Sequence, residues 1–303
     1  MLEEVEEQFH PFFLSHLQIL FPRYRRGQTS APPLFELINT IKSSSDLSAY
    51  LWPQKFTETV NWKAFLLVIK RALTYHFRRK IQLIKSVKEL NFLTDFCRSL
   101  APGDVLISFN WDCLFEILFN RLGLPWTTEL PTLNNGWDYE WPKDRIYILK
   151  LHGSVDWMRQ IFSAEVLSPR WAAAISRTSN MYRITDYENE DIGTLIEGDD
   201  PTIHLPGEER PSGEFREIWE IALKFLLKAS ELTFIGYSLP SYDLYERNLF
   251  LVSTGRARAE GNDQKIKIVN PDLGLKLVYE SVFGDTVEYY DLKFGNWVKG
   301  IKP

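Results

Sequence analysis

Four short apolar runs of this sequence each end in polar residues that could do chemistry. The run at 104–109 ends in Asn110-Trp-Asp112, and the run at 146–151 ends in His152-Gly-Ser. An asparagine side chain donates and accepts hydrogen bonds at once, which suits a hydroxyl group of a ligand. A histidine can take up a proton near neutral pH. Asn110, Asp112 and His152 are therefore the candidates for proton transfer and for positioning a polar ligand.

The other two runs end in residues that suit a ligand-binding loop. The third ends in Gly236-Tyr-Ser238, and the fourth, at 265–269, ends in Asn270-Pro-Asp272. A glycine at the end of a strand lets a ligand approach the backbone without a Cβ in the way. The candidates for holding a cofactor are therefore Gly236, Ser238, Asn270 and Asp272.

Each of these tips also has a purely structural interpretation. Asn110 and Asp112 are equally suited to cap a helix that starts near Asp112, because asparagine is a preferred cap and a carboxylate favours a helix N-terminus. A lone histidine such as His152 is more often bonded to backbone than catalytic. Gly236 and Ser238 also suit a simple turn before a proline. The sequence leaves these alternatives open.

The elements that must position these residues are strands alternating with helices. A helix is expected at 215–229, before the third run at 232–235, and another at 273–283, after the fourth. This alternation predicts an α/β fold with a doubly wound, Rossmann-like, mostly parallel sheet. Ligands of such sheets bind beyond the carboxyl ends of the strands. We therefore expect the four polar tips to form one site.

Two other regions accompany this core. Residues 1–100 have mainly helical periodicity, for example at 61–79, and the pattern changes at Pro102-Gly103. The Rossmann-like core is expected at 101–303, after this helical region. Within the core, residues about 159–211 carry few periodic signals and several acidic residues, which predicts an irregular insert.

Composition excludes several classes of function. The net charge of -5 gives no general attraction to phosphate backbones, which argues against nucleic acid as a ligand. The two cysteines, Cys97 and Cys113, have no CxxC spacing, so neither a structural zinc site nor a disulfide framework is supported. No apolar run reaches the roughly 20 residues that span a bilayer. These features predict a cytoplasmic location. His204 lies in the irregular region and is assigned no role.

Four segments follow one another along the chain: Ser108–Asp112, Leu149–Trp157, Ile235–Asp243 and Val269–Asp272. Taken together and in this order, they resemble the sirtuin-like family of NAD-consuming enzymes. The resemblance is strongest to the bacterial branch linked to anti-phage defence, and it covers roughly residues 30 to 300. The His-Gly-Ser segment combined with Gly-Tyr-Ser-Leu-Pro is fairly specific, whereas each motif alone is weak. Their full sequences are Ser108-Phe-Asn-Trp-Asp112, Leu149-Lys-Leu-His-Gly-Ser-Val-Asp-Trp157, Ile235-Gly-Tyr-Ser-Leu-Pro-Ser-Tyr-Asp243 and Val269-Asn-Pro-Asp272.

The resemblance implies a role for each residue of the first two tips. Asn110 matches the asparagine that orders the nicotinamide ribose and the attacking water. Asp112 matches the acid that contacts the nicotinamide carboxamide. His152 matches the histidine that acts as base toward a ribose hydroxyl or water. The implied activity is hydrolysis of NAD to nicotinamide and ADP-ribose.

The resemblance also implies how the rest of NAD would be held. Gly236 and Ser238 match a segment that lies against the phosphates and ribose, and Asn270 and Asp272 match the region near the adenosine half. Sirtuins that remove acyl groups from proteins carry a four-cysteine zinc module, and two separated cysteines cannot supply it. NAD is therefore expected as the substrate, without zinc. The implied partners are NAD or an ADP-ribose-type nucleotide, and a homo-oligomer or a partner defence protein.

One part of the family's pattern is missing. The family begins with a central strand and a Gly-Ala-Gly-x-Ser loop whose amides hold the pyrophosphate. The first glycine here is Gly27, which follows Arg25 and Arg26 and no convincing strand. These arginines either contact phosphates or belong to a solvated basic loop. Without its central strand, the sheet is expected to split into two halves with unpaired edges.

Three explanations of the missing loop are open. The strand and loop lie upstream of Met1, or another chain or segment fills the gap, or the domain has lost catalysis. In the last case the chain is a catalytically impaired module that binds NAD or ADP-ribose, or that serves assembly.

Overall fold

The computed structural model describes eight segments of the chain. The described residues are 62–83, 91–128, 143–160, 181–183, 199–205, 214–241, 243–285 and 287–300. The helices expected before residue 61, the basic loop around Gly27 and much of the expected insert at 159–211 lie outside them. The chain divides into two compact units, which are described separately. Unit 1 comprises residues 1–83, 110–113 and 152–209, and unit 2 comprises 84–109, 114–151 and 210–303.

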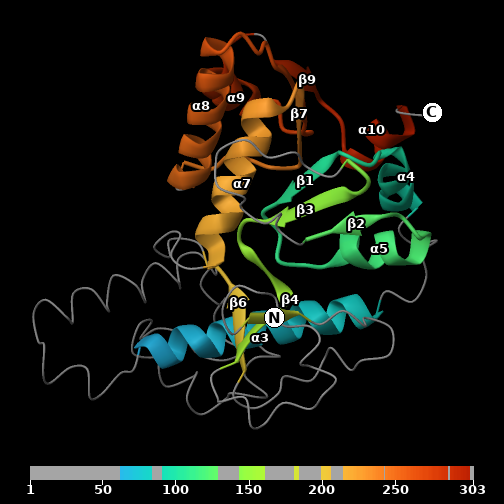
Figure 1. Cartoon of the computed structure of the whole chain (residues 1–303), viewed down its shortest axis with the longest axis vertical. Helices are drawn as coiled ribbons and strands as arrows, with labels where there is room; N and C mark the ends of the chain where they lie inside the picture. Colours follow the sequence, from blue (N-terminus) through green and yellow to red (C-terminus); the bar gives the residue numbers. More distant parts are fainter. Residues whose placement is uncertain are drawn as a thin grey trace, which may run out of the picture. The chain divides into compact units, whose positions relative to one another are not determined.

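Unit 1 consists of one long helix against a small antiparallel sheet. The helix α3(Trp62–Leu83) confirms the helix expected at 61–79 and runs slightly further. Its residues Ile69, Ala72 and Leu73 are buried, as their helical spacing indicates. The strands β5(Met181–Arg183), β4(Gly153–Gln160) and β6(Asp199–Ile203) follow one another in that order across the sheet. Figure 1 shows α3, in blue, running alongside β4 and β6.

The first sheet of unit 2 is parallel and small. It contains β1(Val105–Ser108), β3(Ile146–Lys150) and β2(Trp126–Thr127), with β3 in the middle. The helices α4(Asn91–Ser99) and α5(Leu114–Leu122) cover it. Their shared core is fully buried and is made of Cys97, Leu118, Phe119, Ile146 and Ile148.

The second sheet of unit 2 is also parallel, and helices connect its consecutive strands. It contains β7(Glu231–Ile235), β8(Lys265–Val269) and β9(Glu288–Tyr290). The helix α8(Leu244–Ala259) joins β7 to β8, and α9(Leu275–Phe283) joins β8 to β9, as parallel pairing requires. The helix α7(Glu214–Lys228) precedes β7, and α10(Phe294–Gly300) ends the described chain.

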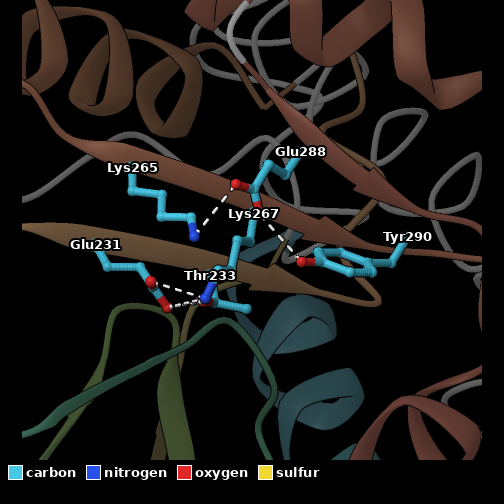
Figure 2. Close-up of polar contacts among 6 residues, drawn as sticks. All are labelled: Glu231, Thr233, Lys265, Lys267, Glu288 and Tyr290. Carbon is cyan, nitrogen blue, oxygen red and sulfur yellow. Dashed lines mark hydrogen bonds and ion pairs between the residues drawn. The ribbon is translucent and has the colours of Figure 1, made fainter. Parts of the chain in front are cut away.

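The two faces of this second sheet differ in character because side chains alternate along a strand. On the buried face, the Phe234 ring packs against Phe250 and Phe283, with centroids 4.9 and 5.1 Å apart. The opposite face carries charged pairs, in which Lys267 contacts Glu231 at 2.7 Å. A second exposed pair joins Lys265 to Glu288 at 3.2 Å. Figure 2 shows this ladder, which is made of Glu231, Thr233, Lys265, Lys267, Glu288 and Tyr290.

The predicted fold class is confirmed: the chain is an α/β protein with Rossmann-type parallel strands and connecting helices. The four predicted strands are present as β1, β3, β7 and β8. Among the described residues, unit 2 has two separate three-stranded sheets. The split expected from a missing central strand stays a prediction. The domain boundary at residue 100 stays a prediction. No described helix is long and apolar enough to cross a membrane.

Candidate functional site

The segment Asn110–Cys113 connects β1 to α5 but belongs to unit 1. Its anchor is Trp111, the residue between the two candidate polar side chains. The Trp111 carbonyl accepts hydrogen bonds from the Val155 N–H at 2.8 Å and from the Ser154 hydroxyl at 3.3 Å. These bonds attach the segment to the beginning of β4. Asn110 and Asp112 therefore flank a residue whose carbonyl is held in place by two hydrogen bonds from β4.

The Trp111 side chain provides a second attachment. Its indole N–H donates to the His204 carbonyl at 3.1 Å, just beyond the end of β6. Its ring meets the Phe77 ring of α3 edge-on, with centroids 6.0 Å apart. Trp111 thus contacts three elements of unit 1: α3, the start of β4 and the end of β6. Asn110 is exposed at this position and Asp112 is half-buried.

His152 is held at the same end of the antiparallel sheet. It immediately precedes β4, and its carbonyl accepts a hydrogen bond from the His204 N–H at 2.8 Å. Gly153 follows with φ +74°, in the left-handed region that favours glycine. The His-Gly pair of the sequence therefore marks a turn into β4, and the His152 side chain is half-buried there.

Three predicted site residues, Asn110, Asp112 and His152, thus lie in unit 1. A fourth residue, His204, connects His152 to the segment that carries the other two. His204 donates its N–H to His152 and accepts the indole N–H of Trp111 through its carbonyl. Trp111, which lies between Asn110 and Asp112, and His152 are therefore both hydrogen-bonded to the residue that follows β6. Sequence reasoning assigned His204 no role, and its position opposite His152 could not be read from an irregular segment.

Beneath this strand end lies a buried polar layer. Arg78 of α3 is 1% exposed, and its Nε donates to the Val155 carbonyl at 2.6 Å. Ser154 and Asp156 of β4 are equally inaccessible to solvent. A buried guanidinium without hydrogen-bond acceptors raises the free energy of the folded state. The bond from Arg78 therefore fixes the position of β4 relative to α3.

The other four predicted site residues lie in unit 2, at the ends of β7 and β8. Gly236 has φ +65°, and its N–H donates to the Val269 carbonyl at 3.0 Å. Apart from Gly236 and its two chain neighbours, no residue has an atom within 4 Å of the point a Cβ would occupy. Gly236 and Ser238 are exposed. Open space above an exposed backbone is what close approach of a ligand requires, so both residues keep their predicted role as candidates.

The residue between them, Tyr237, holds this loop in place. Its hydroxyl donates to the Asp243 carboxylate at 2.7 Å, and its carbonyl accepts the Tyr279 hydroxyl at 2.7 Å. Burial, followed by the hydrogen bond to Asp243, raises the pKa of Tyr237 well above its usual range. Its ring also stacks on Phe109, with centroids 4.6 Å apart. Tyr237 therefore serves the loop as a neutral structural hydroxyl.

Asn270 has a structural use that the sequence did not reveal. Its side chain is 7% exposed, accepts the Asp272 N–H at 3.0 Å and donates to the Tyr237 carbonyl at 3.4 Å. The amide therefore ties the tip of β8 to the tip of β7. Asp272 is exposed, and one of its carboxylate oxygens accepts the Gly274 N–H at 2.9 Å. Of the two residues, Asp272 presents the more accessible group to a ligand.

The cysteines do not offer a nucleophile. Cys97 and Cys113 are both buried, and burial raises the pKa of the Cys97 thiol to about 12. Within the described segments, no group of three or more His, Cys, Asp or Glu side chains is arranged to hold a metal ion.

Gly236 yields a direct test of the loop geometry. Because its φ is +65°, alanine at this position is expected to lower the free energy of unfolding by about 1–2 kcal/mol, the usual cost of a left-handed L-residue. Gly255, inside α8 and also with open space around it, is the matched control. There, alanine is expected to stabilise the protein by about 0.5–1 kcal/mol. Urea denaturation measures both, and effects of the same sign would contradict the assignment.

Comparison with known proteins gives matches among solved structures. No family model matches the chain. No curated protein matches it. A mutant Sir2 homologue in complex with ADP ribose is 15% identical, with a TM-score of 0.43, and the match covers 83% of this chain and 80% of that chain. A Sir2 homologue in complex with NAD is 15% identical, with a TM-score of 0.37, over 98% of this chain and 84% of that chain.

A third match is Sir2 in complex with an inhibitor, 2′-O-acetyl-ADP-ribose and a deacetylated peptide. It is 18% identical, with a TM-score of 0.32, and the match covers 52% of this chain. The chain spans 56% of the length of that Sir2 chain. The chain is thus similar to Sir2 homologues at low identity.

Proposed function

We propose that this chain hydrolyses NAD to nicotinamide and ADP-ribose. The observation that carries the proposal is the attachment of Trp111 and His152 to one strand end through His204. It supports the proposal because Asn110, Asp112 and His152 belong to the same unit. Their side-chain types suit a reaction that depends on alignment more than on a strong nucleophile.

In the proposed reaction, His152, Asn110 and Asp112 each have one role. The oxygen of a water molecule forms a bond to the anomeric carbon of the nicotinamide ribose while the bond from that carbon to the nicotinamide nitrogen breaks. Nicotinamide leaves as a neutral molecule, and His152 takes the proton that the water loses. Asn110 orders the ribose and the water, and Asp112 contacts the carboxamide. Positive charge develops on the sugar, so a carboxylate in the site also favours the transition state.

The tips of β7 and β8 are proposed to hold the ADP part of NAD. The exposed Gly236 backbone and the Ser238 hydroxyl are proposed to bind the phosphates and ribose. The Asp272 carboxylate would accept a ribose hydroxyl, while Asn270 keeps the two loops together. Zinc has no part in this proposal.

The biological setting is part of the same proposal. The resemblance of the four motifs favours a cytoplasmic effector of bacterial anti-phage defence that depletes NAD during infection. Such an effector would assemble with further copies of itself or with a partner defence protein. The depletion of NAD in cells that express the chain, measured with and without phage, tests this setting separately from the chemistry.

The chemistry is tested with the purified full chain. Incubation with NAD is expected to release nicotinamide and ADP-ribose in equal amounts, separated and quantified by chromatography. NAD and ADP-ribose are the ligands of the similar Sir2 structures and are therefore the probes. Calorimetric titration with ADP-ribose measures binding independently of turnover. Absence of both release and binding would overturn the proposal.

A second candidate function is a catalytically impaired module that binds NAD or ADP-ribose, or serves assembly. The specific observation in its favour is the absence of a Gly-x-Gly-x-Ser phosphate-binding loop from the sequence. Binding of ADP-ribose without release of nicotinamide from NAD would support this candidate and exclude the first.

A further inference from the structure

The loop that follows β7, residues 236–240, contains a leucine in an unusual backbone conformation. Leu239 has φ +47°, and among the described residues it is the one residue other than glycine with a positive φ. The left-handed region is unfavourable for a residue with a Cβ, and the proline that follows Leu239 favours an extended conformation instead. Such a conformation persists only where the surrounding structure holds it.

Contacts from α8 and from the residue before it hold the end of the loop. The Leu239 carbonyl accepts a hydrogen bond from Nη1 of Arg247, in α8, at 3.1 Å. The Pro240 carbonyl accepts the Asp243 N–H at 3.1 Å. A charged donor makes the stronger of two such bonds, which is the one from Arg247. The Leu239 side chain is 1% exposed, so its burial also opposes release of the strained backbone.

The beginning of the loop is held by the neighbouring elements. The Gly236 N–H donates to the Val269 carbonyl at 3.0 Å, and the Tyr237 carbonyl accepts the Tyr279 hydroxyl at 2.7 Å. Between the two held ends, Gly236 and Ser238 are exposed. A loop that is fixed before a ligand arrives loses little conformational entropy when the ligand binds.

We propose that Arg247 is a positioning residue that keeps the loop 236–240 in the conformation that binds the diphosphate of an ADP-containing nucleotide. The strain at Leu239 supports a function for the loop, because strained backbone is concentrated at ligand-binding and active sites. The groups that the held loop presents are the Gly236 backbone and the Ser238 hydroxyl. The ligand part of this inference rests on the proposed binding of NAD, whereas the hold of Arg247 on the loop does not.

The hold on the loop is tested by amide hydrogen exchange, followed by nuclear magnetic resonance on the full chain without any nucleotide. In the unaltered protein, we expect the amides of Gly236 and Asp243 to exchange slowly, because both are hydrogen-bonded. In Arg247→Met, their exchange is expected to be about 10- to 100-fold faster, the size expected for loss of a bond from a charged donor. The amide of Ile268, in β8, is expected to keep its rate.

The matched control is Arg258→Met. Arg258 lies on the same helix, and its Nη2 donates to a backbone carbonyl at the end of α9, that of Phe283, at 3.3 Å. This variant is expected to leave the exchange of the loop amides unchanged. Arg247→Lys keeps a charged donor and is expected to restore part of the slow exchange, since one nitrogen of Arg247 makes the bond to Leu239.

The ligand part is tested by calorimetric titration with ADP-ribose. The affinity is expected to fall about 10-fold in Arg247→Met, because part of the binding energy then orders the loop, and to stay the same in Arg258→Met. Once nicotinamide release is established, the KM for NAD is expected to rise about 10-fold in Arg247→Met. Its kcat is expected to stay within about twofold, because the residues assigned to the reaction are unchanged. A merely less stable variant would lose kcat instead.

Three results would contradict the inference. Fast exchange of the loop amides in the unaltered protein is the first, and it needs no folded variant. The second is exchange in folded Arg247→Met that equals that of the unaltered protein or of Arg258→Met. The third is an unchanged affinity of Arg247→Met for ADP-ribose. If the unaltered chain binds no ADP-ribose, the proposed function and the ligand part fail together, while hydrogen exchange still decides whether Arg247 holds the loop.

Discussion

Alanine in place of His152 is expected to lower the rate of nicotinamide release by about 100- to 10,000-fold, the range for loss of a general base. The side chain is half-buried at the edge of the antiparallel sheet, so its removal leaves no large cavity. The backbone bond to His204 does not depend on the side chain and is expected to persist. The measurement is kcat at saturating NAD, with calorimetric binding of ADP-ribose as a check that the site survives.

The control for this variant is His76→Ala. His76 lies on α3 in the same unit and is also half-buried, with its ring 5.9 Å from that of Phe77. This variant is expected to retain nearly all activity because His76 belongs to none of the four motifs and its described ring contact is with Phe77. If release of nicotinamide survives in His152→Ala, the proposed base is wrong. If both variants lose activity equally, the loss reflects a less stable unit 1 and not the loss of proton transfer by His152.

The parallel strands could be predicted closely because each is a short apolar run between turn signals. The run expected at 265–269 is β8 to the residue, and that expected at 146–151 is β3 with one residue fewer. The shorter strands β2 and β9 were missed, since two or three residues carry no periodicity. The strands β5 and β6 also fall in the segment expected to be irregular, because their pairing with β4 is a long-range property.

The candidate site was predictable in its residue types but not in its attachments. Asn110 and Asp112 could be found from their place after a strand. The residue that fixes them is Trp111, and its hydrogen-bond partners Ser154, Val155 and His204 lie between 43 and 93 residues away along the chain. Contacts over such distances depend on tertiary packing, which no local pattern encodes. The same reason hid His204.

Asn270 shows that a residue matched by a motif can also have a structural use. Its predicted contact with the adenosine half of NAD stays a prediction, while its amide bonds to protein groups at both ends. A motif preserves the residue type at a position without saying whether the side chain binds a ligand or shapes the loop that does. Only the hydrogen-bond partners distinguish the two uses.

Methionine in place of Lys150 is expected to lower the free energy of unfolding by about 3–5 kcal/mol, the usual cost of removing one partner of a buried ion pair. Lys150 ends β3 and Glu116 lies in the first turn of α5. Their side chains are 3% and 1% exposed, and Nζ lies 3.7 Å from Oε1. The substitution keeps the apolar volume of the stem but removes the positive charge that lies 3.7 Å from the buried Glu116 carboxylate. Urea denaturation followed by tryptophan fluorescence measures the change.

Two further variants separate the charge from the packing. The double variant Glu116→Leu with Lys150→Met is expected to recover most of the lost stability, since apolar residues of similar volume often replace a buried pair at little cost. Arg216→Met breaks the pair with Glu220, at 2.8 Å, whose side chains are 73% and 48% exposed. Exposed pairs of this kind contribute at most about 1 kcal/mol, so this control is expected to change little. If the double variant is as unstable as Lys150→Met alone, the cost comes from lost packing contacts of the lysine and not from the loss of its charge beside Glu116.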